Sequence, residues 1–180
     1  MNMSHRGPLP ADPEVDAIVR ALGLVSLPQE GGLYAETYRS ARLLPAGAAG
    51  PEQAGPRACA TAIYYLVTPT RFSALHRVAS TEIFHFYLGD PVRMVQLHPD
   101  GSTSGHVIGV DILAGQRPQV VARRGVWQGT RLLAGGRFAL LGCTVSPGFD
   151  FADYEHGSRA ALMRAYPHAA QEIEALTPDE

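Results

Sequence analysis

Residues 76–89, HRVASTEIFHFYLG, decide the fold of this 180-residue chain. His76 and Glu82 stand in this stretch, and Glu82 opens an apolar segment that ends at Gly89. An imidazole and a carboxylate on neighbouring inward-facing strands can supply nitrogen and oxygen ligands to a transition metal, and a glycine permits a sharp turn after the second strand. The stretch therefore predicts two short strands that carry polar side chains into the interior of a β-structure.

The offsets are those of the first motif of the cupin superfamily, H-x-H-x-x-x-E, with Val78 in place of the second histidine. A counterpart of the second motif, P-x-G-x-x-H, reads RRGVWQ at residues 123–128, where Gly125 is in register and Gln128 replaces the histidine. The candidate ligands of a divalent transition metal are His76, Glu82 and Gln128. Because two of the four ligand positions are changed, we expect any bound metal to be weak or partial.

Four further blocks narrow the resemblance. They are PQEGGLYAETYRS at 28–40, TAIYYL at 61–66, GVWQ at 125–128 and GCTVSPGFDF at 142–151. In this order they resemble the signature blocks of the cupin-5 family, a domain of unknown function, over residues 14 to 175. The resemblance implies an all-β double-stranded β-helix (jelly-roll) barrel, usually a homodimer, with no activity established for the family as a whole.

Length and composition favour one domain over residues 12–180, after a flexible leader at 1–11. A net charge of −2 with scattered charges gives no basic stripe for nucleic acid. The apolar runs are too short for a membrane span, and the N-terminus lacks the apolar segment of a secretory signal, so we expect a cytoplasmic protein. Cys59 and Cys143 are too few for a disulfide framework and are expected to be reduced and buried.

Apolar residues at helical spacing follow Asp12 and Pro13 and stop at Gly23, which predicts a short helix covering one side of the barrel. Residues 45–56 are typical of a surface loop. Beyond it, short apolar segments alternate with turn residues, as in an antiparallel barrel. The expected strands are 34–40, 59–67, 83–88, 92–97, 106–110, 119–122, 130–133 and 138–145. We expect hairpin turns at 99–101 and 134–136, and one or two closing helices beyond Ser158.

The first candidate site residues lie in the opening stretch. His76 is the predicted interior acid/base group, and Glu82 is expected to be paired inside the barrel, because a buried carboxylate is costly without a partner. His85 and Tyr87 face away from Glu82 unless a bulge intervenes, since side chains alternate along a strand. They are secondary candidates, Tyr87 as a proton donor, and the alternative for both is strand packing or a dimer contact.

Other candidates come from the second motif and an early strand. Trp127 could stack on a ligand while Gln128 hydrogen-bonds a polar edge. Tyr34, Glu36 and Tyr38 share one face by alternation, either at the pocket mouth or at a dimer seam. The predicted ligand-binding residues are therefore Ser73, His85, Trp127, Gln128, Tyr34 and Glu36.

Three functions are compatible with this sequence. The favoured one is a pocket for a small polar molecule, such as a carbohydrate or nucleotide-sugar, with isomerase or epimerase acid/base chemistry. The second is a metal-dependent enzyme of the oxygenase type that uses His76, Glu82, Gln128 and His85. The third is a non-catalytic binding or storage protein. Fold does not decide among them, because one barrel can host many activities.

Overall fold

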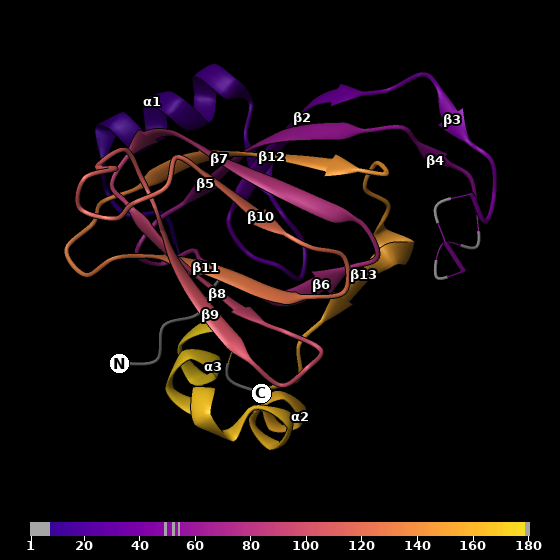
Figure 1. The fold of residues 1–180 in the computed structure, drawn as a ribbon. Helices are drawn as coiled ribbons and strands as arrows, with labels where there is room; N and C mark the ends of the chain where they lie inside the picture. The colour runs from indigo at the N-terminus through magenta and orange to yellow at the C-terminus, as the bar shows by residue number, and fades with distance from the viewer. Residues whose placement is uncertain (1–7, 49, 52, 54, 179–180) are drawn as a thin grey trace.

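A computed structural model describes residues 8–48, 50–51, 53 and 55–178. Two antiparallel sheets face each other and form a barrel (Figure 1). The first sheet has the order β1 (Val25–Ser26), β2 (Leu33–Arg39), β5 (Thr61–Val67), β12 (Ala139–Ser146), β7 (Thr81–Gly89), β10 (Gln119–Ala122). The second has the order β13 (Tyr154–His156), β6 (Ser73–Val78), β11 (Trp127–Leu132), β8 (Val92–Leu97), β9 (Thr103–Ile108). From β5 onward the chain passes repeatedly from one sheet to the other, which is the predicted jelly-roll arrangement of an all-β protein.

The predicted strands are found with small shifts of their bounds. β8 and β10 have the expected limits, whereas β9 and β11 each begin three residues earlier than predicted. The turn at 99–101 joins the paired strands β8 and β9, so that hairpin is confirmed. The prediction of a hairpin turn at 134–136 is wrong, because β11 and β12 lie in different sheets and this turn carries the chain across the barrel.

Gly89 lies at the turn where the chain crosses from β7 in the first sheet to β8 in the second. Its φ of +95° lies in the left-handed region, and a Cβ at this position would lie 2.3 Å from the backbone oxygen of Phe138. Only glycine meets both conditions without strain. The glycine that closes the opening sequence stretch therefore marks a change of sheet rather than a hairpin.

The helix α1 (Pro13–Leu22) begins at the Asp12 cap and ends at Gly23, as predicted. It lies on the outer side of the first sheet, where Val15 packs against Leu66 and Leu140 (Figure 1). Leu9, inside the expected leader, packs against the same cluster, and residues 1–7 lie outside the described residues.

The C-terminal segment covers the outer side of the second sheet (Figure 1). It contains α2 (Arg159–Ala165), η2 (Pro167–Ala169) and α3 (Ala170–Leu176), whereas η1 (Phe151–Asp153) precedes β13 in the chain. Leu162 and Ile173 from these helices pack on Leu75 and Leu97 of the sheet. The loop expected at 45–56 connects β3 (Leu43–Leu44) to β4 (Arg57–Ala58), and its residues 49, 52 and 54 are outside the described part. No helix among the described residues is long and apolar enough to cross a membrane.

Candidate functional site

A cavity of about 490 Å³ opens at one end of the barrel. Thr61, Val145 and Glu82 are paired in register across the first sheet at this end and line the cavity together. Its other polar and aromatic lining consists of Glu30, Glu36, Asp150, Arg39, Cys143, Tyr34, Tyr65, Phe84, Phe149 and Phe151. A depression of similar volume, about 530 Å³, lies beside α3 and contains none of the motif residues. Another depression, of about 490 Å³, is lined by Arg77 and Arg124 but by none of the candidate ligands His76, Glu82 and Gln128. Because Glu82 lines the barrel cavity, that cavity is the candidate site.

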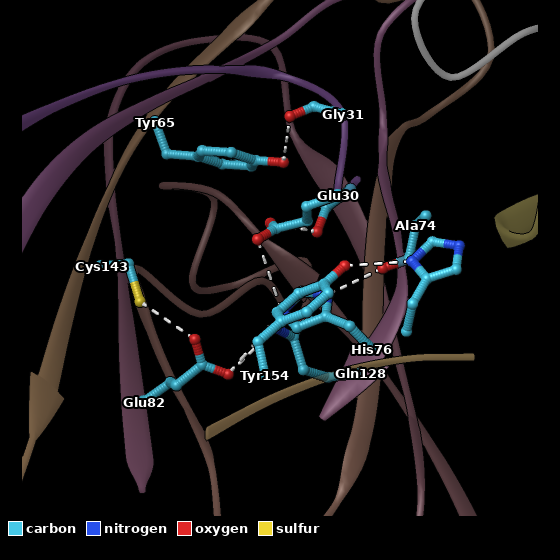
Figure 2. A network of polar contacts seen from close by, with 11 residues as sticks. Glu30, Gly31, Tyr65, Ala74, His76, Glu82, Gln128, Cys143 and Tyr154 are labelled. Atoms are coloured by element: carbon cyan, nitrogen blue, oxygen red, sulfur yellow. Dashed lines mark hydrogen bonds and ion pairs between the residues drawn. The ribbon is translucent and has the colours of Figure 1, made fainter. Parts of the chain in front are cut away.

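His76, Glu82 and Gln128 meet in one polar cluster (Figure 2), in which Glu82 lines the cavity and the other two side chains are buried behind it. Gln128 of β11 is paired in register with His76 of β6, which brings the two side chains together on the inner face. The Gln128 amide nitrogen lies 2.7 Å from His76 Nε2 and 3.1 Å from Glu82 Oε2. All three residues are buried, with 1% of His76 and 0% of Gln128 exposed. The structure thus brings together three side chains that are distant in sequence.

The hydrogen bonds fix the donor and acceptor roles within this cluster. His76 Nδ1 lies 2.8 Å from the carbonyl oxygen of Ala74, which can only accept, so Nδ1 carries the proton. In the neutral ring Nε2 then accepts from the Gln128 amide, whose second N–H is donated to Glu82. The Gln128 carbonyl oxygen has no hydrogen-bond partner among the described residues. The amide therefore orients Glu82 and is itself held by His76.

Glu30 is a site residue that the sequence analysis missed. Its carboxylate lies 3.7 Å from His76 Nε2 and accepts a 2.8 Å hydrogen bond from Ser73. The turn that carries it is held by a backbone bond from Ala74 N to Glu30 O of 2.9 Å. Gly32 follows directly beneath the Tyr65 ring, where a Cβ would lie only 2.6 Å from ring atoms. The Gly31-Gly32 pair was the available signal that this glutamate is placed by a tight turn. The predicted Ser73 thus acts by holding Glu30.

Burial changes the acidity of three groups around the cavity. Burial and the negative charge of Glu30 raise the pKa of Glu82, and the hydrogen bond from Gln128 offsets part of this rise. Burial and the Glu30 charge hold the pKa of Tyr65 well above its usual range. The pKa of the Cys143 thiol is also raised well above its usual value, by burial and by Glu82, so Cys143 stays a protonated thiol. Both cysteines are free, but Cys59 is half-buried rather than buried as expected.

His85 and Tyr87 lie outside the cavity, on the outer face of the first sheet. His85 Nε2 is 3.2 Å from Thr144 Oγ1, and the His85 ring stacks with Tyr87 at 6.4 Å between centroids. Tyr87 is 52% exposed. A bulge does occur, but it lies at Tyr87, beyond both Glu82 and His85, and cannot bring them to one face. Tyr87 therefore cannot donate a proton to a ligand held by Glu82, and His85 cannot join His76 around one metal ion.

Trp127 also lies outside the cavity. It precedes Gln128 on β11 and so points to the other face, where it packs with the cluster beneath the C-terminal helices. The Arg77 guanidinium lies 4.6 Å above its ring. The aromatic wall comes instead from Tyr34, Tyr65, Phe84, Phe149 and Phe151. The FDF segment at 149–151 stood in one of the quoted family blocks and was the missed signal.

Tyr34 and Glu36 line the cavity, but Tyr38 does not share their face. A bulge at Thr37 shifts the register of β2 against β5, so Tyr38 turns outward and is 55% exposed. The same bulge brings Arg39 to the inner face, where its guanidinium donates to Glu36 at 2.9 and 2.6 Å. The predicted alternation is therefore wrong beyond Glu36, and the result is an ion pair at the cavity mouth.

The donor set does not favour a metal centre. Within residues 8–178, outside the three masked positions, no group of three or more His, Cys, Asp or Glu side chains is arranged to hold a metal ion. The site contains one imidazole, and its Nε2 accepts from Gln128. An amide is a weak ligand for the transition metals that imidazole binds.

Known proteins are similar to this chain over most of the barrel. The family model described as Cupin superfamily (DUF985) matches residues 16–157. An uncharacterised protein of Saccharomyces cerevisiae is 31% identical over 134 residues, which cover 70% of this chain and 67% of that protein.

Solved structures of similar proteins extend the match over most of the chain. A hypothetical protein from Leishmania major has a TM-score of 0.82 and 29% identity, covering 91% of this chain and 98% of its own. A protein from Shewanella oneidensis has a TM-score of 0.80 and 31% identity, and the match covers 92% of this chain and 98% of that protein's chain. Oxalate decarboxylase from Bacillus subtilis, at 13% identity and a TM-score of 0.51, shares the fold alone; the match covers 86% of this chain and 37% of that one.

Proposed function

Because this chain belongs to the DUF985 family of the cupin superfamily, we propose that it binds a small polar molecule inside its barrel and transfers a proton to or from it. The observation that carries the proposal is the hydrogen-bonded chain from His76 through Gln128 to Glu82, which lines a 490 Å³ cavity. A cavity of this volume is in the usual range for small-molecule sites, which combine apolar walls with a few fixed polar groups.

The cavity walls suit a compact ligand such as a carbohydrate or one of its derivatives. Tyr34, Tyr65 and Phe149 offer ring faces against which the C–H groups of a ligand can pack. Glu30 and Glu82 offer carboxylate oxygens to hydroxyl or amino groups. A polar molecule with an apolar face would thus pack against the aromatic rings and form hydrogen bonds with the carboxylates.

Glu82 is the proposed acid/base group, in place of His76. His76 is almost fully buried and both of its ring nitrogens are engaged, whereas Glu82 lines the cavity. The raised pKa of Glu82 brings the protonated and ionised forms closer together in free energy, as proton transfer requires. In an isomerase or epimerase reaction, Glu82 would remove a proton from a carbon next to a carbonyl group and return it to the substrate. Gln128 and His76 hold the carboxylate in place for this step.

Ligand binding is expected to depend on Gln128 and not on its neighbour Trp127. Gln128→Ala removes the donor that orients Glu82, and losing such a buried hydrogen bond costs on the order of 1–3 kcal/mol, or about 5- to 150-fold in affinity. The measurement is a thermal-shift screen of sugars and related polar metabolites, followed by calorimetry on both variants. Trp127→Ala is the matched control, because its side chain lies on the opposite face of β11.

Two outcomes of this screen would favour the other functions. Binding that disappears on adding a chelator and returns with a transition metal would support a metal-dependent enzyme. Binding that depends on Gln128, with no turnover of the bound molecule, would support a non-catalytic binding protein. Equal losses of affinity in Gln128→Ala and Trp127→Ala would count against the proposed site.

We also propose that the protein is a homodimer that pairs through the outer face of the first sheet. Tyr38, Tyr87, Leu88 and Val121 are each more than 40% exposed on this face, which α1 covers only in part. Pairing would remove this apolar surface from water. Light scattering at micromolar concentration should give twice the chain mass, and Tyr87→Asp should shift the protein toward the monomer. A monomeric wild type would refute the proposal.

A further inference from the structure

We propose that the ligand of the barrel cavity carries an amine or quaternary ammonium group, which binds between Glu30 and Glu82 against the aromatic wall. This inference rests on the proposed function and names the chemical class of the molecule bound. It follows from the charge balance, the shortage of hydrogen-bond donors and the aromatic lining of the same cavity.

The charge balance of the lining is negative. Four carboxylates line the cavity, those of Glu30, Glu36, Glu82 and Asp150, against the single cation Arg39. Arg39 forms a bidentate pair with Glu36, so its charge is already matched. His76 Nε2 lies 3.7 Å from Glu30 and 4.0 Å from Glu82, too far for a hydrogen bond to either carboxylate. Glu30 and Glu82 therefore face the cavity with no cation in hydrogen-bonding contact among the described residues. A cationic ligand group would supply the missing charge.

The polar cluster is also short of donors. Glu30 Oε1 accepts from Ser73, while its Oε2 lies 3.7 Å from His76 Nε2, beyond hydrogen-bonding distance. Glu82 accepts one amide N–H, and among the described residues its other oxygen meets only the weak thiol donor of Cys143 at 3.8 Å. The buried Gln128 Oε1 has no partner among the described residues. A primary ammonium group offers three N–H donors and no acceptor, which complements this arrangement, whereas a quaternary ammonium group would supply only the positive charge.

The aromatic lining recognises the same kind of group. Phe149 and Phe151 meet edge to face at 5.1 Å between centroids near the cavity mouth, and Tyr34 and Tyr65 supply further rings. Aromatic faces attract cations, and an ammonium group enclosed by rings and carboxylates is held by both effects. Phosphate groups, by contrast, would be repelled by the unmatched carboxylates. The arrangement therefore favours an amino sugar or a small amine over a nucleotide-sugar.

The experiment compares probes that differ in charge but little in shape. Isothermal titration calorimetry on the wild-type protein at one ionic strength would pair choline with 3,3-dimethyl-1-butanol, and glucosamine with glucose, with UDP-glucose as the anionic probe. The charged member of at least one pair is expected to bind about tenfold or more tightly than its neutral partner. This comparison needs no variant, so it does not depend on whether a substituted protein folds.

Two substitutions test whether the preference for a charged probe arises in the barrel cavity. Glu30→Gln should reduce the advantage of the charged probe about tenfold, and Phe149→Ala should weaken the charged probe as well. Glu155→Gln, an exposed carboxylate paired with Arg77 outside the cavity, is the matched control and should leave binding unchanged. Thermal unfolding of each variant establishes that it is folded.

The failures of the two proposals are distinguishable. Neutral sugars that bind as tightly as amines, with a dependence on Gln128, would overturn the charge preference and leave the proposed function standing. If amines bind with the same affinity to wild type, Glu30→Gln and Gln128→Ala, the ligand lies outside the cavity, and both the charge preference and the proposed function are overturned. Absence of binding for both cationic probes up to about 10 mM would refute the ammonium proposal.

Discussion

Replacing Asp153 by alanine is expected to lower the free energy of unfolding by about 3–5 kcal/mol, the usual cost of leaving one member of a buried ion pair alone. The Asp153 carboxylate accepts two hydrogen bonds from Arg57, at 2.8 and 2.7 Å, and one from Gln53 at 3.0 Å. The side chains of Arg57 and Asp153 are only 8% and 1% exposed. In Asp153→Ala the guanidinium and the amide stay buried without this acceptor. Urea unfolding at neutral pH measures the loss.

Glu155→Ala is the matched control for this prediction. Glu155 lies two residues further along the chain and pairs with Arg77 at 2.6 Å, but the two side chains are 54% and 41% exposed. An exposed pair contributes about 1 kcal/mol or less, because water screens it. Comparable losses in the two variants would show that the Asp153 pair does not behave as a buried one.

The ion pair between Arg57 and Asp153 also affects the position of residues that line the cavity. Asp153 ends η1, the segment that begins with Phe151, and its backbone oxygen accepts from Ala79 N at 3.2 Å. The pair therefore fixes the segment that brings Phe149 and Phe151 to the cavity mouth. We expect a folded but weakened Asp153→Ala protein to bind any cavity ligand less tightly.

Glu82→Gln is expected to change binding and stability in opposite directions. A hydrogen bond to a charged group contributes about 1.5–3 kcal/mol, so removing the charge should weaken a ligand held by Glu82 by roughly 10- to 150-fold. Stability should rise at the same time, because an ionised carboxylate in this buried position costs more free energy than a neutral amide does. Calorimetric binding and chemical unfolding on the same preparation test both parts.

The stability effect has a defined pH dependence. Burial raises the pKa of Glu82 above its ordinary value of 4.5, so the folded protein holds this proton to a higher pH than the unfolded chain does. The contribution of Glu82 is therefore least unfavourable below the ordinary value, and stability falls as the pH rises through the folded pKa. The advantage of Glu82→Gln should grow over this range and shrink toward acid pH. Glu155→Gln, an exposed carboxylate, should show no such gain, and a gain of equal size there would contradict the explanation.

The sequence by itself determined the elements of the barrel and one pair of site residues. Alternating apolar residues and turn residues predicted the strands, since strand formation and turn geometry depend on neighbouring residues. Asp12 and Gly23 predicted the limits of α1 for the same reason, because caps act within one helical turn. The offset between His76 and Glu82 placed two polar side chains inside the barrel, and both are buried there.

The tertiary structure alone decided which other side chains share the cavity. A bulge of one residue at Thr37 reverses every later side chain of β2, so Arg39 enters the cavity and Tyr38 leaves it. Whether a strand has such a bulge depends on its hydrogen bonds to a partner strand, and these are not encoded in local alternation. Glu30 meets Ser73 and His76 from 43 and 46 residues away, through a turn that docks on β6. Local preference acts over a few residues, whereas the composition of a cavity depends on contacts between distant segments, and these form only when the two sheets pack.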